Sequence, residues 1–276
     1  MISGLGACSD TETGAAGSTS QGNPSSSEDG GTDSSTTAVT TAGVCDGSSG
    51  EFEISEGESS GGSAEDTNGG MGGDIPIGLT VFTLREEEIA AGTLVEIADL
   101  VVTAPIVATP DGALVFLQAT VGGEYSGITA VVPGSDAEFA IGTRVRVVGR
   151  VARLGDIVRI VVDGDVNGDV EEIIDEGVAA LPEPFVVDLV ELADPTGALE
   201  PYDSALVRVV TPKVTDADLC PGEFAISSEL RVDNLFLGDL APTPATGTEY
   251  SALLGALRAT GDGFEIAPRS LDDLEP

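Results

Sequence analysis

The chain has 276 residues, 48 acidic and 11 basic side chains, and a net charge of −37. It contains no histidine, which excludes a histidine general base, proton relay or zinc ligand. Nucleic-acid affinity comes largely from Lys and Arg on phosphates, so a chain this acidic repels nucleic acid overall, and it is repelled by bare anionic lipid as well.

The N-terminus contains the run Leu5-Gly6-Ala7-Cys8. Two small residues before a cysteine resemble the lipobox of bacterial lipoproteins, whose cysteine thiol takes a diacylglyceryl group. The resemblance implies that residues 1–8 are the remnant of a lipoprotein signal and that a lipidated Cys8 makes the membrane a partner. The alternative is a chance cysteine in a tail of small residues. The expected location is the cell envelope, as an outer membrane lipoprotein or at the cell surface.

The composition changes sharply near residue 75. Residues 1–75 contain 13 acids, no Lys or Arg, and a dense mixture of Gly, Ser and Thr. Few large apolar side chains are available there to offset the entropy of ordering the chain. We therefore expect residues 9–75 to form a disordered, acidic tether that repels itself and extends.

The other two cysteines are a disulfide candidate. With Cys8 lipidated, Cys45 and Cys220 remain, and a pair of cysteines in an exported chain indicates a bridge. Such a bridge would fasten the tether to the second half of the folded region. Two free thiols, or pairing between molecules, are the alternatives.

The rest of the chain predicts an all-β fold. Val- and Ile-rich segments follow one another and are separated by Pro-Asp-Gly, Gly-Gly and Pro-Gly turns. Residues 143–147 alternate, so Val145 and Val147 should face a core while Arg144 and Arg146 face solvent. One helix is expected around Leu84 to Ala91, where helix formers gather.

An internal repeat predicts two related β domains, at 76–181 and 182–276. Leu94-Val95-Glu96-Ile97 precedes Val102-Thr103 with the spacing at which Leu206-Val207-Arg208-Val209 precedes Val214-Thr215. Later, Gly142-Thr143, Gly149 and Gly155-Asp156 correspond in order to Gly247-Thr248, Gly255 and Gly261-Asp262. Two ordered sets of matches favour a duplication over chance.

The strand and turn order resembles OB-fold modules, small β-barrels, with Gly149 expected at a bend or bulge where the barrel turns a corner. FLQATVGGEYSGITAVV with GTRVRVVGRVARLGDIVRI resembles the OB-like domain that precedes the catalytic domain of secreted bacterial nucleases. The second half is similar to the companion half of such pairs, which also occur without an enzyme domain in myxobacterial lipoproteins. The resemblance implies two tandem OB-fold-like barrels without the nuclease's catalytic domain.

The basic residues of the folded region concentrate on one predicted hairpin: Arg144, Arg146, Arg150, Arg153 and Arg159. We expect them to pair with the abundant surface carboxylates. The alternative is an accessory nucleic-acid site, which the negative charge of the chain disfavours.

The segment from Asp163 to Glu172 suggests a calcium loop. Asp163, Asp165, Asn167 and Asp169 alternate, with Gly168 among them, as oxygen ligands wrapped around calcium do. Ile174 stands where an EF-hand would have glutamate, so any calcium loop here is of another type. An acidic connector of turn-forming residues is the alternative. No other cofactor is indicated.

The sequence therefore predicts a noncatalytic exported lipoprotein that serves as a surface-displayed binding or adhesion module. Its partner is expected to be a protein or a glycan rather than nucleic acid. An accessory nucleic-acid-binding OB module and a structural component of the cell envelope remain as alternatives.

Overall fold

The computed structural model describes residues 75–276, apart from 110–111, 134–137, 155–156, 167–168, 189–198 and 261–262. The lipobox with Cys8, and the tether except for its last residue, lie outside this range. The all-β prediction is confirmed: the described strands form two eight-stranded sheets and a separate two-stranded hairpin, accompanied by one short α-helix.

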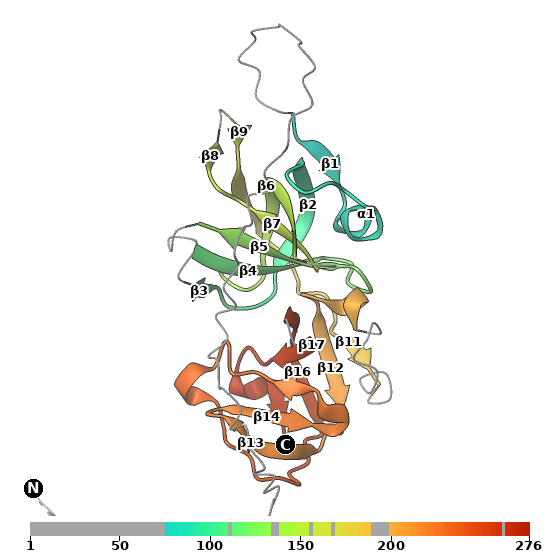
Figure 1. Ribbon diagram of the computed structural model, residues 1–276, viewed down its shortest axis with the longest axis vertical. Helices are drawn as coiled ribbons and strands as arrows, with labels where there is room; N and C mark the ends of the chain where they lie inside the picture. The colour runs from blue at the N-terminus through green and yellow to red at the C-terminus, as the bar shows by residue number, and fades with distance from the viewer. Residues whose placement is uncertain are drawn as a thin grey trace, which may run out of the picture. The chain divides into compact units, whose positions relative to one another are not determined.

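The first sheet is a closed barrel with extra strands (Figure 1). Its elements are β1 (Ile77–Leu79), α1 (Val81–Glu86), β2 (Leu94–Val102), β3 (Val107–Thr109), β4 (Gly112–Ala119), β5 (Gly127–Val132), β6 (Thr143–Leu154), β7 (Ile157–Val161) and β10 (Glu172–Val178). Strands β2, β4, β5, β7 and β6 pair in this order, and β6 pairs again with β2. Only the β5–β7 pairing in this ring is parallel. In chain order the ring is first, second, third, fifth, fourth, which is the OB-fold arrangement.

The interior of this barrel follows the predicted alternation. Val145 and Val147 are buried, whereas Arg144 and Arg146 keep partly exposed side chains. Residues at alternate positions of β4 and β5, such as Val115, Leu117 and Ile128, belong to the same apolar core. Because successive side chains of a strand point to opposite faces, every second side chain fills the barrel and the others point outward.

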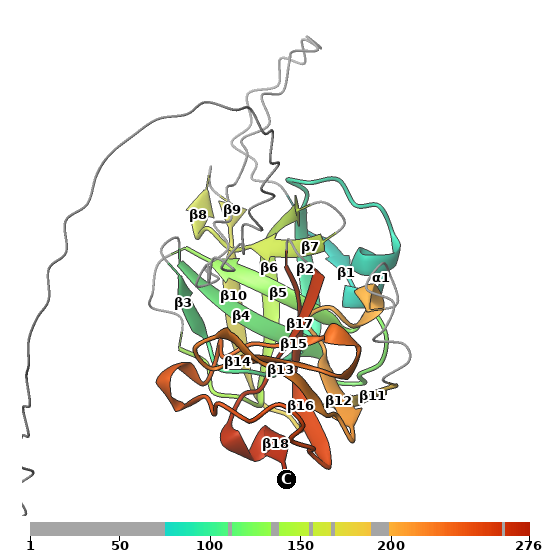
Figure 2. The same cartoon turned by 60° about the horizontal axis from the view of Figure 1, so that its bottom comes forward.

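The second sheet, drawn in orange to red in Figure 2, repeats the ring order in its pairings, which run from β12 through β16, β17, β15 and β14 to β13. Its strands are β11 (Phe185–Val187), β12 (Leu206–Val210), β13 (Val214–Cys220), β14 (Glu223–Ile226), β15 (Arg231–Val232), β16 (Ala252–Thr260), β17 (Gly263–Ala267) and β18 (Leu274–Glu275). Here the first barrel strand is divided into β12 and β13 between Val210 and Val214, where Thr211 has a φ of 48° and Pro212 lacks an amide hydrogen. Like β5 and β7, β15 and β17 pair in parallel.

The register of the strands matches the repeat seen in the sequence. In the first sheet β1 runs parallel to β2, and in the second β11 runs parallel to β12. Val95 pairs with Gly149 between β2 and β6, and Val207 pairs with Gly255 between β12 and β16. The two glycines therefore occupy equivalent positions in the two barrels.

Of the bend or bulge predicted at Gly149, the bulge is not found, because the strand register is continuous through Gly149, and the bend stays a prediction. The register of β2 against β6 shifts between Ile97 and Leu100, where Asp99 has a φ of 57°. Gly149 is needed for close approach instead: a Cβ there would lie 2.5 Å from the carbonyl oxygen of Val161, and at Gly255 a Cβ would lie 2.5 Å from that of Ala267.

We expect Gly149→Ala and Gly255→Ala each to destabilise the protein by about 1–3 kcal/mol, because a methyl group overpacks against backbone. Urea unfolding at equilibrium measures both values. Gly78→Ala is the matched control, since nothing lies within 4 Å of a Cβ at that exposed strand position. An alanine tolerated at either barrel glycine would contradict the close approach.

The helix prediction was partly wrong. Helix α1 begins after Thr80, whose hydroxyl accepts a hydrogen bond from the amide of Thr83, and it ends at Glu86. Glu87 has an extended backbone, and the carbonyl oxygens of Glu87 and Ile89 accept hydrogen bonds from the side chain of Arg153. No helix of the described residues is long and apolar enough to cross a membrane.

Candidate functional site

The outward side of β4, β5 and β7 in the first barrel is the surface that OB folds use for ligands, on the second and third strands and nearby loops. In this protein four of the outward side chains there are buried, namely Phe116 and Gln118 from β4, Thr129 from β5, and Arg159 from β7. Leu114, Ile157 and Val161, also outward, are partly exposed. Residues of the second barrel cover the four buried side chains. This inter-barrel site has a charged part, a neutral polar part and an apolar part.

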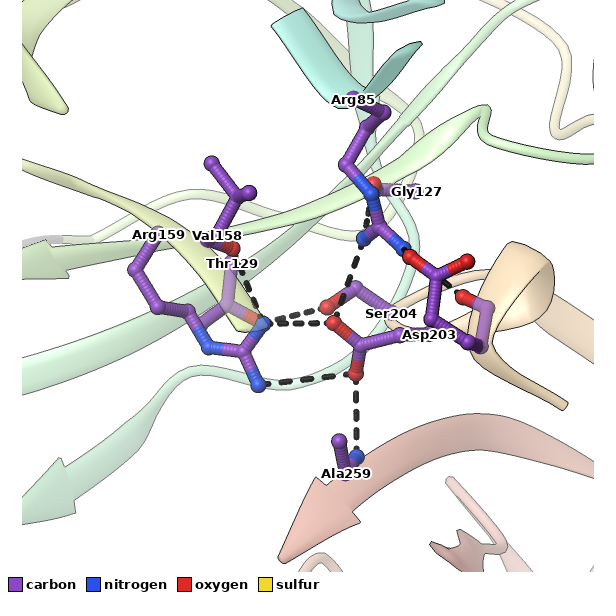
Figure 3. Close-up of polar contacts among 9 residues, drawn as sticks. Arg85, Gly127, Thr129, Val158, Arg159, Asp203, Ser204 and Ala259 are labelled. Atoms are coloured by element: carbon purple, nitrogen blue, oxygen red, sulfur yellow. Dashed lines mark hydrogen bonds and ion pairs between the residues drawn. The ribbon is translucent and has the colours of Figure 1, made fainter. Parts of the chain in front are cut away.

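The charged part centres on Asp203, whose carboxylate lies between two guanidinium groups (Figure 3). Arg159 Nη1 donates to Asp203 Oδ2 at 2.6 Å, and Arg85 Nη1 donates to the same oxygen at 3.3 Å. The amide of Ala259 donates to Asp203 Oδ1 at 3.0 Å. Arg85, which is 2% exposed, also donates to Glu200 Oε1 at 3.0 Å. Helix α1 and strand β7 thus hold two cations around one carboxylate from the second barrel.

These contacts keep Asp203 ionised. Burial by itself would raise the pKa of the Asp203 carboxyl, but the positive charge and hydrogen bond of Arg159 outweigh it, and Arg85 and the amide of Ala259 add to them. The pKa therefore lies below the ordinary value of 3.8. The folded structure favours the charged form at neutral pH.

The neutral polar part surrounds β5. The Oγ1 atom of Thr129 and the Oγ of Ser204 are 2.8 Å apart. Gln118 donates to the hydroxyl of Ser126 and accepts from the amide of Leu206 at 3.1 Å. At Gly127 a Cβ would lie 2.4 Å from the amide nitrogen of Ala205, so the two backbones meet without room for a methyl group.

The apolar part joins the two barrels beside the charged one. Phe116 and Phe236 pack edge to face with ring centroids 5.3 Å apart. Ala104 and Ala256, one from each half of the chain, are buried in the same cluster. Together the three parts bury Phe116, Gln118, Thr129 and Arg159 against the second half of the chain.

The predicted arginine cluster is engaged with partners. Arg146 donates to Glu96 at 3.1 Å and to Glu176 at 3.2 Å, and Arg144 lies 3.7 Å from the second oxygen of Glu176. Both pairs lie on the partly exposed outside of β6.

The remaining three arginines have other partners. Arg150 donates to the buried carboxylate of Glu171 at 2.9 Å. Arg153 binds backbone carbonyl groups, and Arg159 lies in the inter-barrel site with Asp203. The five arginines therefore do not form one surface, and the nucleic-acid role proposed for them stays a prediction.

The predicted calcium segment contains a short hairpin. Strands β8 (Asp165–Val166) and β9 (Asp169–Val170) pair antiparallel, with Val166 opposite Asp169. Asn167 and the side chains of Asp165 and Asp169 lie outside the described residues, whereas Asp163 is described and exposed. Among the side chains that are described, none form a group of three metal-ligating residues. Calcium binding stays a prediction.

Of the predicted disulfide, only Cys220 can be placed. It is the last residue of β13. Cys45 lies outside the described residues, so the pairing of the two cysteines stays a prediction.

Two residues central to the inter-barrel site, Arg85 and Asp203, were missed by sequence reasoning. They are 118 positions apart, and each resembles an ordinary surface charge in its own segment. The available signal was the polar pair Asp203-Ser204, which Ala205 separates from the apolar strand Leu206–Val210. A polar pair so close to a buried strand is a candidate for burial.

Comparison with known proteins assigns this chain to no family, so we classify it by its fold. No protein-family model and no curated protein matches the chain. The structure of a murine DNA-binding protein bound with double-stranded DNA is similar at 13% identity, covering 66% of this chain and 97% of that chain with a TM-score of 0.31. A likeness this weak supports no conclusion about function. The observed topology defines the class: an all-β protein with two tandem OB-fold-like barrels.

Proposed function

We propose that this protein is a noncatalytic binding or adhesion module of the cell envelope, in which two OB-like barrels act as one rigid unit that recognises a protein or a glycan. The observation that carries the proposal is the inter-barrel site. Phe116, Gln118, Thr129 and Arg159, on the side of the first barrel that OB folds use for ligands, are covered by the second barrel, which favours partner recognition by other surfaces of the pair.

The charge distribution favours such a partner over nucleic acid. An OB barrel that binds single strands combines a positively charged groove with stacking aromatic rings. Here Arg144, Arg146, Arg150 and Arg159 each lie against a carboxylate, and Phe116 is buried between the barrels. With the net charge of −37, these pairings weaken attraction to phosphates.

The same proposal includes features that rest on the sequence. A lipidated Cys8 would anchor the protein to the outer membrane, and residues 9–75 would carry the barrels away from it. A bridge between Cys45 and Cys220 would attach the tether to the second barrel rather than to the first.

Thermal unfolding of the full chain with separate probes tests the proposal. The probes are mixed oligosaccharides, a single-stranded oligonucleotide, and calcium compared with EDTA. A ligand at about 100 times its dissociation constant adds about 2.7 kcal/mol, which shifts the midpoint by several degrees. We expect a shift with oligosaccharides if the partner is a glycan, and none with the oligonucleotide.

An oligonucleotide shift that disappears in Arg144→Gln would contradict the proposal and favour the accessory nucleic-acid module. A calcium shift that disappears in Asp165→Ala would establish the acidic segment as a calcium site. If no probe shifts the midpoint, a glycan partner is ruled out at the concentrations used, and a protein partner or a structural envelope role is left.

A further inference from the structure

The second barrel contains a buried group of charges away from Asp203, here called the β17 charge cluster. Its members are Glu223 of β14, Arg231 of β15, Asp233, Arg258 of β16 and Glu265 of β17. Asp233, Arg258 and Glu265 are all less than 9% exposed. Three carboxylates and two guanidinium groups leave one excess negative charge when every member is ionised.

Two of the carboxylates share one donor nitrogen. Arg258 Nη2 donates to Asp233 Oδ2 at 2.5 Å and to Glu265 Oε2 at 2.7 Å. Arg231 supports Glu265 from the other side at 3.1 Å and lies 3.7 Å from Glu223. Glu265 therefore contacts two guanidinium groups, whereas the contacts of Asp233 include one, which it shares.

We propose that the β17 charge cluster is a proton-binding site, in which Asp233 takes up one proton in mildly acidic solution and thereby stabilises the folded second barrel. Two carboxylates that share a buried site cannot both ionise without a large repulsion. A proton on Asp233 removes the excess negative charge and leaves Glu265 with its two cations.

The balance of forces assigns the proton to Asp233. Burial raises the pKa of its carboxyl to about 6; Arg258 opposes this rise, and the charges of Glu265 and Glu223 add to it. Burial would likewise raise the pKa of Glu265, but Arg258 and Arg231 reverse the effect and lower that pKa below 4.5. The asymmetry follows from the number of guanidinium groups that each carboxylate contacts.

Other uses of the cluster fit less well. A catalytic pair of carboxylates has to reach a substrate, and both Asp233 and Glu265 are buried. No three acidic, histidine or cysteine side chains of the described residues are arranged to hold a metal ion. A proton is small enough to enter without displacing the covering residues.

The cluster adjoins the contact between the barrels. Asp233 Oδ1 accepts a hydrogen bond from the amide of Leu235 at 3.0 Å. Leu235 and Phe236 pack against the apolar cluster that contains Phe116 of the first barrel. A change in the protonation state of Asp233 therefore changes a carboxyl group that is hydrogen-bonded to the residue before Phe236.

The sign of the effect follows from linkage. The pKa of Asp233 is about 6 in the folded chain against 3.8 for the ordinary group, so the folded chain binds the proton roughly 100-fold more tightly. The stabilisation is fully present below pH ~4 and is lost as the pH rises from ~4 to ~6.

The test compares the full chain with Asp233→Asn, which imitates the protonated carboxyl, across pH 3.5 to 7.5. Because other carboxylates titrate in both proteins, the informative quantity is the difference in unfolding midpoint. We expect the unmodified protein to gain stability relative to Asp233→Asn as the pH falls from ~6 to ~4. Glu249→Gln, at an exposed carboxylate paired with Lys213, should give a difference with no such slope. Parallel pH profiles for the unmodified chain and Asp233→Asn would overturn the proposal.

A second measurement does not depend on the variant folding. Carbon-13 NMR of the side-chain carboxyls in the unmodified protein should show one aspartate whose pKa is about 6, roughly 100-fold more weakly acidic than an ordinary aspartate. If every aspartate carboxyl titrates below pH ~5, the proton is not held and the proposal is wrong.

Discussion

Asp203→Asn should destabilise the folded protein by about 3–5 kcal/mol, because it leaves two buried guanidinium groups without their shared anion. The substitution keeps the shape of the side chain, and its amide oxygen can still accept from Ala259. The loss therefore reports the missing charge beside Arg85 and Arg159 rather than a cavity. Equilibrium urea unfolding at neutral pH gives the value.

The control for charge alone is Asp239→Asn, at an exposed site, where we expect a change within about 0.5 kcal/mol. Adding Arg159→Met to Asp203→Asn should cost less than the two single changes summed, since the second change removes the cation whose described anion is Asp203. A loss of under about 1 kcal/mol for Asp203→Asn would contradict a structural role for this carboxylate.

Phe116→Ala should destabilise the protein by about 3–5 kcal/mol, through lost burial and the cavity that the ring leaves between the barrels. Phe116 is 1% exposed, and its ring meets that of Phe236 edge to face. Phe236→Ala should cost less, because Phe236 is only partly buried. Denaturant unfolding of both variants and of the double variant measures the contact.

The double-mutant cycle should give a coupling of about 0.5–1.5 kcal/mol between the two rings. Strictly additive losses would show that the aromatic contact does not help join the barrels. Phe264→Ala is the comparison for loss of a partly buried ring that packs against the core of the second barrel and not against the inter-barrel apolar cluster.

The sequence could predict what depends on local pattern. Alternation identified Val145 and Val147 as core, and ordered spacing placed Gly149 and Gly255 in equivalent positions, because both signals are carried by neighbouring residues or by a duplicated segment. A bend or bulge was predicted at Gly149, and the register shift lies instead at Ile97–Leu100 of β2, since a glycine can serve close approach as well as a bulge. The helix ends earlier than predicted, and beyond its end Arg153 donates to the carbonyl oxygens of Glu87 and Ile89, a long-range contact that the local pattern does not contain.

The inter-barrel site and the β17 charge cluster could not be found in this way. Asp203 meets Arg159 across 44 positions, and Asp233 meets Arg258 across 25. In so acidic a chain, no pattern separates a buried carboxylate from the many on the surface. Only the packing of one sheet against another decides which acids lose their water and need a cation.

Synthesis from the N-terminus completes the strands of the first barrel, the last of which ends at Val178, before Asp203 has been added. At that stage the ring of Phe116 is uncovered, and Arg85 and Arg159 lack the anion that balances them in the finished protein. The first barrel can then serve as a template, whose cations attract the incoming acidic segment and whose apolar surface receives Phe236. The second barrel would therefore assemble against a surface already in place, and a chain interrupted before residue 203 would present that surface to other proteins as a site for aggregation.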